Sequence, residues 1–205
     1  MVDALQGYIP DTAFEQVTQL LSHGNLVVKI KQERKTRHGD YRRMPNGKHQ
    51  ITINSNLNPY RFLITLLHEV AHFEAYKTCG NKIKPHGLEW KSIFQHLMLP
   101  FLRPDVFPNE VLPLLAKHFK NPKASSDSDT VLALTLKQYD PPNGKIFIFE
   151  VPEGTVFKIY NGKLFRKGPK IRTRFQCTNL DTGRLYVFNP NAEVELVNES
   201  NISNE

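Results

Sequence analysis

Cysteine is scarce in this sequence: its 205 residues include two, Cys79 and Cys177. Two cysteines so far apart exclude the disulfide framework of a small secreted domain. They are also too few for a zinc site made of four cysteines. We therefore expect free thiols in a reducing compartment, which predicts a cytoplasmic protein, with association with the nucleoid as a further hypothesis.

Long hydrophobic runs are also missing. The mean hydropathy is −0.43, and no apolar stretch approaches the roughly 20 residues that cross a bilayer. Residues 1–7 carry neither the basic region nor the apolar core of a secretory signal. The sequence thus predicts no membrane partner, and it leaves the oligomeric state open.

Acidic residues are outnumbered, with 20 Asp and Glu against 27 Lys and Arg and a formal net charge of +7. The excess lies in segments 29–48 and 153–186, and such clusters attract phosphate backbones without reading base sequence. DNA or RNA is therefore a hypothetical partner. Both segments also fit solvated faces, and the first fits recognition of acidic substrate segments. The basic residues proposed to contact nucleic acid are Lys29, Lys31, Arg34, Lys35, Arg42, Arg43, Lys163, Arg166, Lys167, Lys170, Arg172 and Arg174.

The five residues His68-Glu69-Val70-Ala71-His72 carry the clearest chemical signal. Residues four apart share one face of a helix, so His68 and His72 can direct both imidazoles at one metal ion. Glu69 projects from an adjacent line, where it can hydrogen-bond a metal-bound water without being a ligand. This is the HExxH pattern of zinc hydrolases, in which zinc acidifies the water and the glutamate takes its proton.

The HExxH residues lie in an apolar stretch that predicts a buried helix from about residue 59 to residue 78. Two histidines and a glutamate on a buried helix need partners, because unpaired buried polar groups are costly. A metal ion would satisfy all three side chains. The alternative is a helix whose histidines hydrogen-bond locally and whose glutamate is solvated.

A zinc site of this type needs a third protein ligand. His86 is favoured, because Pro85 and the apolar periodicity that follows place it at the start of another helix, at about 87–99. Glu89 is the rival, since a glutamate from a later helix completes some HExxH sites. His96 lies almost three turns further along and is less favoured. The sequence thus predicts one Zn²⁺ per chain.

The pattern up to residue 120 indicates helices around a small β-sheet, an α+β arrangement. A polar run without periodicity at 121–130 is typical of a linker, and residues 198–205 are polar enough to be disordered. We therefore predict one domain over 1–120 and a second over 131–197. The expected elements of the first domain are helix 10–21, strand 26–32, a hairpin-like return at 39–41, strand 49–54, and helices 59–78, 87–99 and 109–119.

Beyond the linker, short strands with turn signals predict a small antiparallel all-β domain of barrel-like character. Its basic residues alternate with aromatic ones, and aromatic rings beside a cationic groove can stack on the bases of a single strand. In an antiparallel sheet, however, aromatic residues usually face the core while Lys and Arg face water. Both interpretations stay open. The expected strands are 131–139, 145–151, 155–160, 163–167, 171–178, 184–188 and 193–197, and the aromatic residues are Phe157, Tyr160, Phe165, Phe175, Tyr186 and Phe188.

Several segments occur in a recognisable order: Val28-Lys29-Ile30, Gly39-Asp40-Tyr41-Arg42, Ile51-Thr52-Ile53-Asn54, the HExxH residues, and His86-Gly87-Leu88-Glu89-Trp90. Over about residues 10–100 the chain resembles the SprT-like metalloprotease family, which includes the Spartan proteases that degrade proteins crosslinked to DNA. The resemblance implies a zincin-like helical domain with zinc bound by His68, His72 and His86. It also implies that Glu69 is the general base and that the substrates are proteins on or near nucleic acid.

One departure from the family pattern concerns the C-terminal part. Many SprT-like proteins carry a zinc ribbon made of two CxxC pairs there, and this chain has only Cys177 in the corresponding region. Cys177 falls in a segment of similar position and strand character. We therefore expect a C-terminal β domain that persists without the ribbon metal.

Two functional hypotheses of different classes follow. The first is a zinc-dependent metallopeptidase in which Glu69 deprotonates a zinc-activated water for attack on a peptide bond. The second is a non-catalytic DNA- or RNA-associated binding protein whose zinc is structural. A zinc hydrolase acting on something other than peptides is a third, because the motif specifies water activation and not the substrate.

Overall fold

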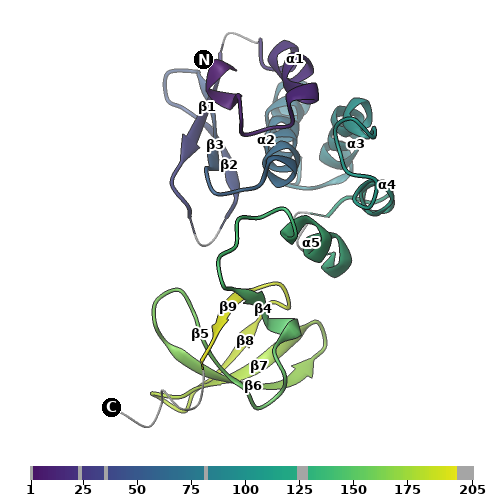
Figure 1. Ribbon diagram of the computed structural model, residues 1–205. Helices are drawn as coiled ribbons and strands as arrows, with labels where there is room; N and C mark the ends of the chain where they lie inside the picture. Colours follow the sequence, from purple (N-terminus) through teal and green to yellow (C-terminus); the bar gives the residue numbers. More distant parts are fainter. Residues whose placement is uncertain (1, 23–24, 35–36, 81–82, 124–128, 198–205) are drawn as a thin grey trace. The chain divides into compact units, whose positions relative to one another are not determined.

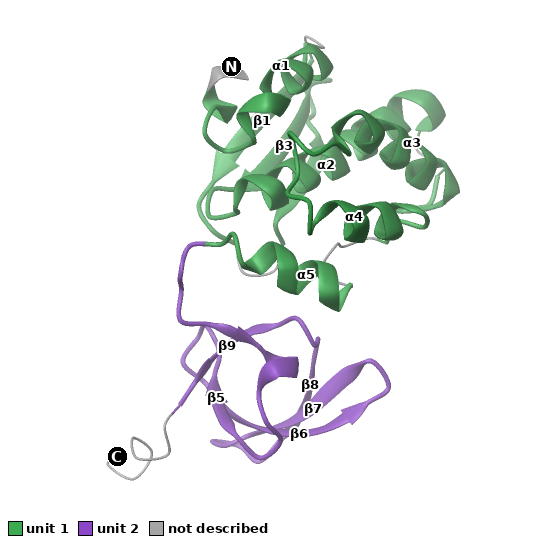
Figure 2. Cartoon of the chain, turned by 45° about the vertical axis from the view of Figure 1, so that its right-hand side comes forward, with its two compact units in different colours: residues 1–140 green, residues 141–205 purple. Residues whose placement is uncertain are grey.

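The computed structural model describes residues 2–22, 25–34, 37–80, 83–123 and 129–197, and it divides the chain into two compact units, shown in Figure 2. Unit 1 comprises Met1–Asp140 and unit 2 comprises Pro141–Glu205. Helices with a small sheet form unit 1, and an antiparallel sheet forms unit 2, so the predicted α+β class is confirmed. Among the described residues, no helix has the length and apolar character needed to cross a membrane.

The sheet of unit 1 has three strands, β1 (Leu26–Lys31), β2 (Gly39–Arg43) and β3 (His49–Asn54), in the order β1-β3-β2. β3 pairs in parallel with β1 and antiparallel with β2. The hairpin-like return expected at residues 39–41 therefore pairs with the strand after it and not with the strand before it. β3 takes the centre because Ile51 and Ile53 are fully buried and Thr52 and Asn54 nearly so, which leaves neither of its faces in water.

Helix α2 (Pro59–Cys79) is the central element of unit 1 (Figure 1). It contacts β2, β3 and α3 (Leu88–Met98). Asn58 is the N-cap of α2: its side chain accepts hydrogen bonds from the backbone N–H groups of Tyr60 and Arg61, at 3.1 and 3.0 Å. The remaining elements of unit 1 are η1 (Val2–Leu5), α1 (Asp11–Leu20), η3 (Leu99–Phe101), α4 (Leu112–Phe119) and α5 (Thr130–Lys137).

α5 replaces the strand predicted at residues 131–139, so that prediction is wrong. Alternating apolar residues in this segment fit a strand, but Leu132, Ala133 and Leu136 also have helical spacing, and all three are fully buried. Asp129, within the run interpreted as a linker, accepts a hydrogen bond from the Leu132 N–H and caps the helix. Residues 124–128 of the expected linker and the expected tail at 198–205 lie outside the described residues.

Buried polar contacts attach α5 to the start of α2. The Asn58 side-chain amide donates to the Leu136 carbonyl at 2.8 Å and to the Asp140 carboxylate at 2.6 Å. Arg61, which is 6% exposed, donates from Nη2 to the Ala133 carbonyl at 2.7 Å. Unit 1 therefore extends past the predicted boundary at residue 120, because α5 and Asp140 supply acceptors to the side chains at the N-terminus of α2.

Unit 2 contains a six-stranded antiparallel sheet in the order β4-β9-β5-β6-β7-β8. Phe157 and Phe165 are buried in its core with Cys177, whereas Tyr160 and Tyr186 are exposed. Most of the predicted aromatic set therefore packs inward. The elements are β4 (Ile146–Phe147), η5 (Ile148–Glu150), β5 (Val156–Lys158), β6 (Leu164–Ile171), β7 (Arg174–Asn179), β8 (Leu185–Phe188) and β9 (Glu193–Leu196).

A chain ending at Lys120 should be less stable than one ending at Asp140. It loses the burial of Leu132 and Leu136, worth about 3–6 kcal/mol together, and it leaves the buried Arg61 guanidinium without its carbonyl acceptor. We expect the thermal midpoint, followed by circular dichroism, to fall by about 10 °C or more. Equal thermal midpoints for the two fragments would instead support a domain that ends at residue 120.

Candidate metal centre

Three histidine side chains converge in unit 1. The Nε2 atoms of His68 and His72 are 3.2 Å apart, those of His72 and His86 are 3.0 Å apart, and those of His86 and His68 are 3.2 Å apart. Among the described residues, this is the group of His, Cys, Asp and Glu side chains whose atoms lie close enough together to hold a metal ion. The structure thus brings together the three residues that the sequence selected.

Two elements position these imidazoles. His68 and His72 lie one turn apart on α2. His86 lies in the turn before α3, where its backbone has φ 59°, a left-handed conformation that costs a non-glycine residue roughly 1–2 kcal/mol. Gly87 follows, and a Cβ there would lie 3.0 Å from the Lys84 carbonyl oxygen. The tight turn directs the His86 ring toward α2.

The donor set fits a zinc ion. Zn–N bonds of about 2.0–2.1 Å in a tetrahedral arrangement place ligand nitrogens about 3.3 Å apart, close to the observed separations. Burial lowers the pKa of His68 to about 2 and that of His72 to about 4, and it also lowers the pKa of His86. All three rings are therefore neutral, which is the form that binds metal. Three neutral nitrogens that face one another could bind a shared cation.

Trp90 of α3 packs against all three imidazoles. Its ring centroid lies 4.7 Å from that of His68, 5.3 Å from that of His72 and 4.6 Å from that of His86. Trp90 is fully buried, and Phe94 stacks beside it at 4.9 Å. The indole thus restricts the rotation of the three rings and keeps water from one side of the group.

Glu69 lies on α2 beside the histidines and is 7% exposed. Burial, helped by the nearby Asp40 carboxylate, raises its pKa to about 8, although Arg34 and a hydrogen bond with the Tyr41 backbone oppose the rise. β2 approaches closely here: a Cβ on Gly39 would lie 3.1 Å from the Glu69 Cγ and Oε1 atoms and 2.8 Å from the Thr65 Cγ2 atom. Gly39 therefore leaves the space that the carboxylate occupies.

A polar network that the sequence did not predict lies next to Glu69. Arg34 donates to Asp40, to the Thr52 hydroxyl at 2.8 Å and to the Asn54 side chain at 2.9 Å. Burial alone would raise the pKa of Asp40, but hydrogen bonds from Thr52, Arg34 and Arg42 hold it below its usual value. Asp40 is thus ionised and fixed in place. The available signal was an acidic residue within a basic segment.

The rival third ligands lie elsewhere. Glu89 is exposed in the first turn of α3 and does not belong to the metal-binding group. His96 is exposed on the same helix, and its Nδ1 atom lies 2.8 Å from the Ser92 carbonyl oxygen. The geometry therefore favours His86 over both.

The basic residues predicted to contact nucleic acid have different environments. Lys167 is 6% exposed and donates to the Val151 carbonyl, so its assignment to a binding surface is wrong. Its ammonium also lies 4.0 Å from the centroid of the Phe175 ring. Arg34 is engaged in the Asp40 network, and Lys35 lies outside the described residues. The exposed members are Lys29, Lys31, Arg42, Arg43, Lys163, Arg166, Lys170, Arg172 and Arg174.

Residues 10–108 match the model of the SprT-like family. Comparison with curated proteins and with solved structures gave no match. The matched segment contains α2, the turn before α3 and α3 itself, and therefore all three histidines and Glu69. Residues 10–108 thus form a SprT-like domain.

Proposed function

We propose that this protein is a zinc-dependent metallopeptidase. The observation that carries the proposal is the convergence of the His68, His72 and His86 Nε2 atoms, 3.0–3.2 Å apart, beside the buried carboxylate of Glu69. Three neutral imidazoles are the donor set of catalytic zinc sites that leave one coordination position open. When bound, zinc lowers the pKa of a coordinated water and polarises the carbonyl of the peptide bond.

Glu69 moves the proton in this mechanism. Its carboxylate accepts the proton of the attacking water and then donates it to the leaving amine of the peptide. A pKa of about 8 suits both transfers near neutral pH, since the group can take and return a proton without a large energy difference. Gly39 and the Tyr41 backbone keep the carboxylate on one side of α2, facing β2.

We also propose that the substrates are proteins on or near nucleic acid. Support comes from unit 2, where Lys170, Arg172 and Arg174 are exposed about the β6–β7 turn. Arg172 has φ 54° at this turn, and ion-pair partners for these three residues are absent from the described part of the chain. Unpaired cations on a turn can neutralise phosphates without reading sequence.

Elemental analysis of protein purified without chelators tests the metal. We expect about one zinc per chain in the wild type and less than about 0.2 in His86→Asn and His86→Ala, because each variant loses one of three protein ligands. Asn tolerates the left-handed backbone of His86 and Ala does not, so Asn separates ligand loss from strain. Full zinc occupancy in both variants would exclude His86 as a ligand.

Glu69→Gln should retain zinc and lose hydrolysis of denatured casein by about 10²- to 10⁴-fold, because the amide cannot accept the proton. The matched control is Glu74→Gln on the same helix, whose carboxylate pairs with Lys77 at 3.2 Å and, two residues after His72, lies on another face of the helix. We expect the control to cleave at the wild-type rate in a quenched-fluorescence assay.

Undiminished cleavage by Glu69→Gln would overturn the mechanism. A wild-type protein that cleaves no denatured protein, yet binds a single-stranded oligonucleotide with an affinity that falls steeply with salt, would favour the non-catalytic binding protein with a structural zinc. Oligonucleotide binding that is absent at low salt would remove nucleic acid as a partner.

Gly39→Ala should lower kcat about 10- to 100-fold while zinc content stays the same. The new methyl group would meet the Thr65 methyl group at 2.8 Å and the Glu69 carboxylate at 3.1 Å, so the carboxylate has to shift. Adding Thr65→Ala removes the nearest clash and should restore part of the rate. Wild-type kcat in the single variant would show that β2 does not position Glu69.

A further inference from the structure

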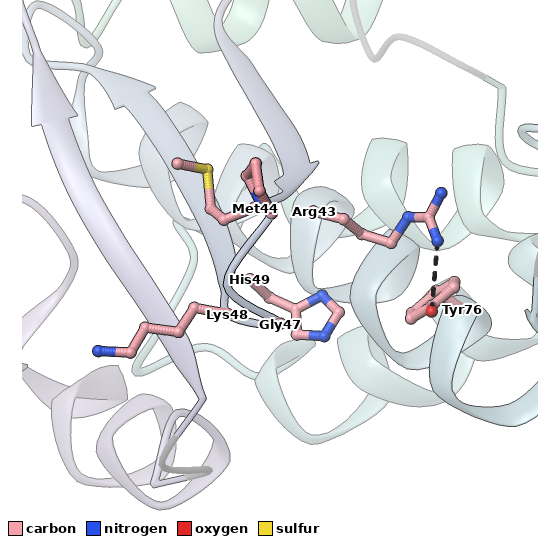
Figure 3. Close-up of a pocket in the computed structure, with 7 residues that line it drawn as sticks. Arg43, Met44, Gly47, Lys48, His49 and Tyr76 are labelled. Atoms are coloured by element: carbon pink, nitrogen blue, oxygen red, sulfur yellow. Dashed lines mark hydrogen bonds between the residues drawn. The ribbon is translucent and has the colours of Figure 1, made fainter.

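A pocket lies between the β2–β3 hairpin and α2 (Figure 3). Its volume is about 200 Å³, enough for one side chain of moderate size. Tyr76 of α2 forms one wall, and the hairpin supplies the rest. The lining residues are Arg43, Met44, Pro45, Gly47, Lys48, His49 and Tyr76.

Hydrogen-bond donors face this pocket. The Arg43 guanidinium lies 4.7 Å from the centroid of the Tyr76 ring and donates to the Tyr76 hydroxyl at 3.3 Å. The His49 Nδ1 atom lies 2.8 Å from the Tyr41 hydroxyl. When that hydroxyl donates, the proton of the imidazole is on Nε2 and is available to a ligand. The pocket thus offers a cation and a phenol, with the His49 imidazole in its lining.

Carboxylates are absent from the lining of the pocket. Within the described part of the chain, neither Arg43 nor Lys48 has a carboxylate within ion-pair distance. The guanidinium therefore retains donors that only a ligand or water can satisfy. The Lys48 ammonium points away from His49 and Tyr76 (Figure 3), so Arg43 provides the positive charge.

The pocket lies one helical turn from the metal centre. Tyr76 follows His72 by four residues on α2, which corresponds to about 6 Å along the helix axis. β2 runs alongside this part of α2, because Gly39 lies against Glu69 and Arg43 lies against Tyr76. An extended peptide advances about 3.3 Å per residue. The pocket is thus two or three residues away from a bond cleaved at the histidines.

We propose that this pocket is a substrate subsite that binds the carboxylate of an aspartate or glutamate two or three residues from the cleaved bond. The proposal rests on the peptidase function proposed above. A nucleic acid backbone fits less well, because it carries a charge at every nucleotide and needs a track of cations. Here one guanidinium faces a small pocket whose volume suits a single side chain.

Cleavage mapping is the first part of the test. The zinc-loaded full chain is incubated with a denatured-proteome peptide library, and the cleavage sites are read by mass spectrometry. Acidic residues should be enriched about tenfold at two or three residues from the cleaved bond, as expected for one charge-assisted hydrogen-bonded pair. Arg43→Gln should reduce the enrichment to less than about twofold. Cleavage without any acidic preference overturns the proposal.

Binding is the second part, and it does not depend on catalysis. Fluorescein-labelled alanine-rich heptapeptides with a central Glu or Gln are titrated against zinc-loaded Glu69→Gln protein, with fluorescence anisotropy as the readout. The Glu peptide should bind about tenfold more tightly than the Gln peptide. Arg43→Gln should abolish the difference, and Tyr76→Phe, which keeps the ring, should halve it. The charge-matched control Lys117→Gln, at an exposed residue of α4, should retain the difference in affinity.

The outcomes separate the two proposals. A Glu preference without cleavage of any library peptide would remove the peptidase function and leave the carboxylate pocket. Equal affinity for the Glu and Gln peptides overturns the pocket, whether or not cleavage is seen. Equal peptide affinities, together with a ten-nucleotide oligothymidine whose binding Arg43→Gln weakens tenfold, would instead identify a phosphate site.

Discussion

Burial of α2 is the constraint on which the rest of unit 1 depends. The helix carries His68, Glu69 and His72 in its middle, and neighbours on several sides exclude water from it. Removing water makes the imidazoles neutral and makes the Glu69 carboxylate a stronger base, as the lowered histidine pKa values and the raised glutamate pKa show. The same burial would destabilise the fold if these groups had no partners. A metal ion bound by the histidines would provide such a partner.

β2 connects the features of the site. At its start, Gly39 has no side chain and lets the strand approach Glu69, and Asp40 is held ionised nearby by Arg34 and Arg42. At its end, Arg43 reaches the Tyr76 ring. The short strand β2 thus packs along α2 with Glu69 near its start and the cationic pocket near its end. The basic residues of segment 29–48 therefore have different roles: Arg34 stabilises the network around Asp40, whereas Arg43 stays available to a ligand in the pocket.

The convergence of the three histidines could be predicted from the sequence because its signal is local. Residues at i and i+4 share a helix face in any context, so His68 and His72 needed no tertiary information. His86 was identified by type and spacing, but its left-handed backbone was not. The partners of Glu69 come from β2 and the Arg34 network, which are remote in the chain, and no pattern within α2 indicates them. The pairing order β1-β3-β2 likewise depends on which strand is buried on both faces.

The error at α5 and the core of unit 2 both depend on how apolar surface is buried. The apolar residues of α5 fit the periodicity of a strand and also that of a helix. The helix is favoured because it places carbonyl and carboxylate acceptors beside Asn58 and Arg61. In unit 2, Phe157 and Phe165 are buried with Cys177 in one apolar core. Lys167 lies buried there because its ammonium finds a carbonyl and an aromatic face. Hence the basic residues of unit 2 divide between folding and the surface, and only the exposed ones can support the proposed contact with nucleic acid.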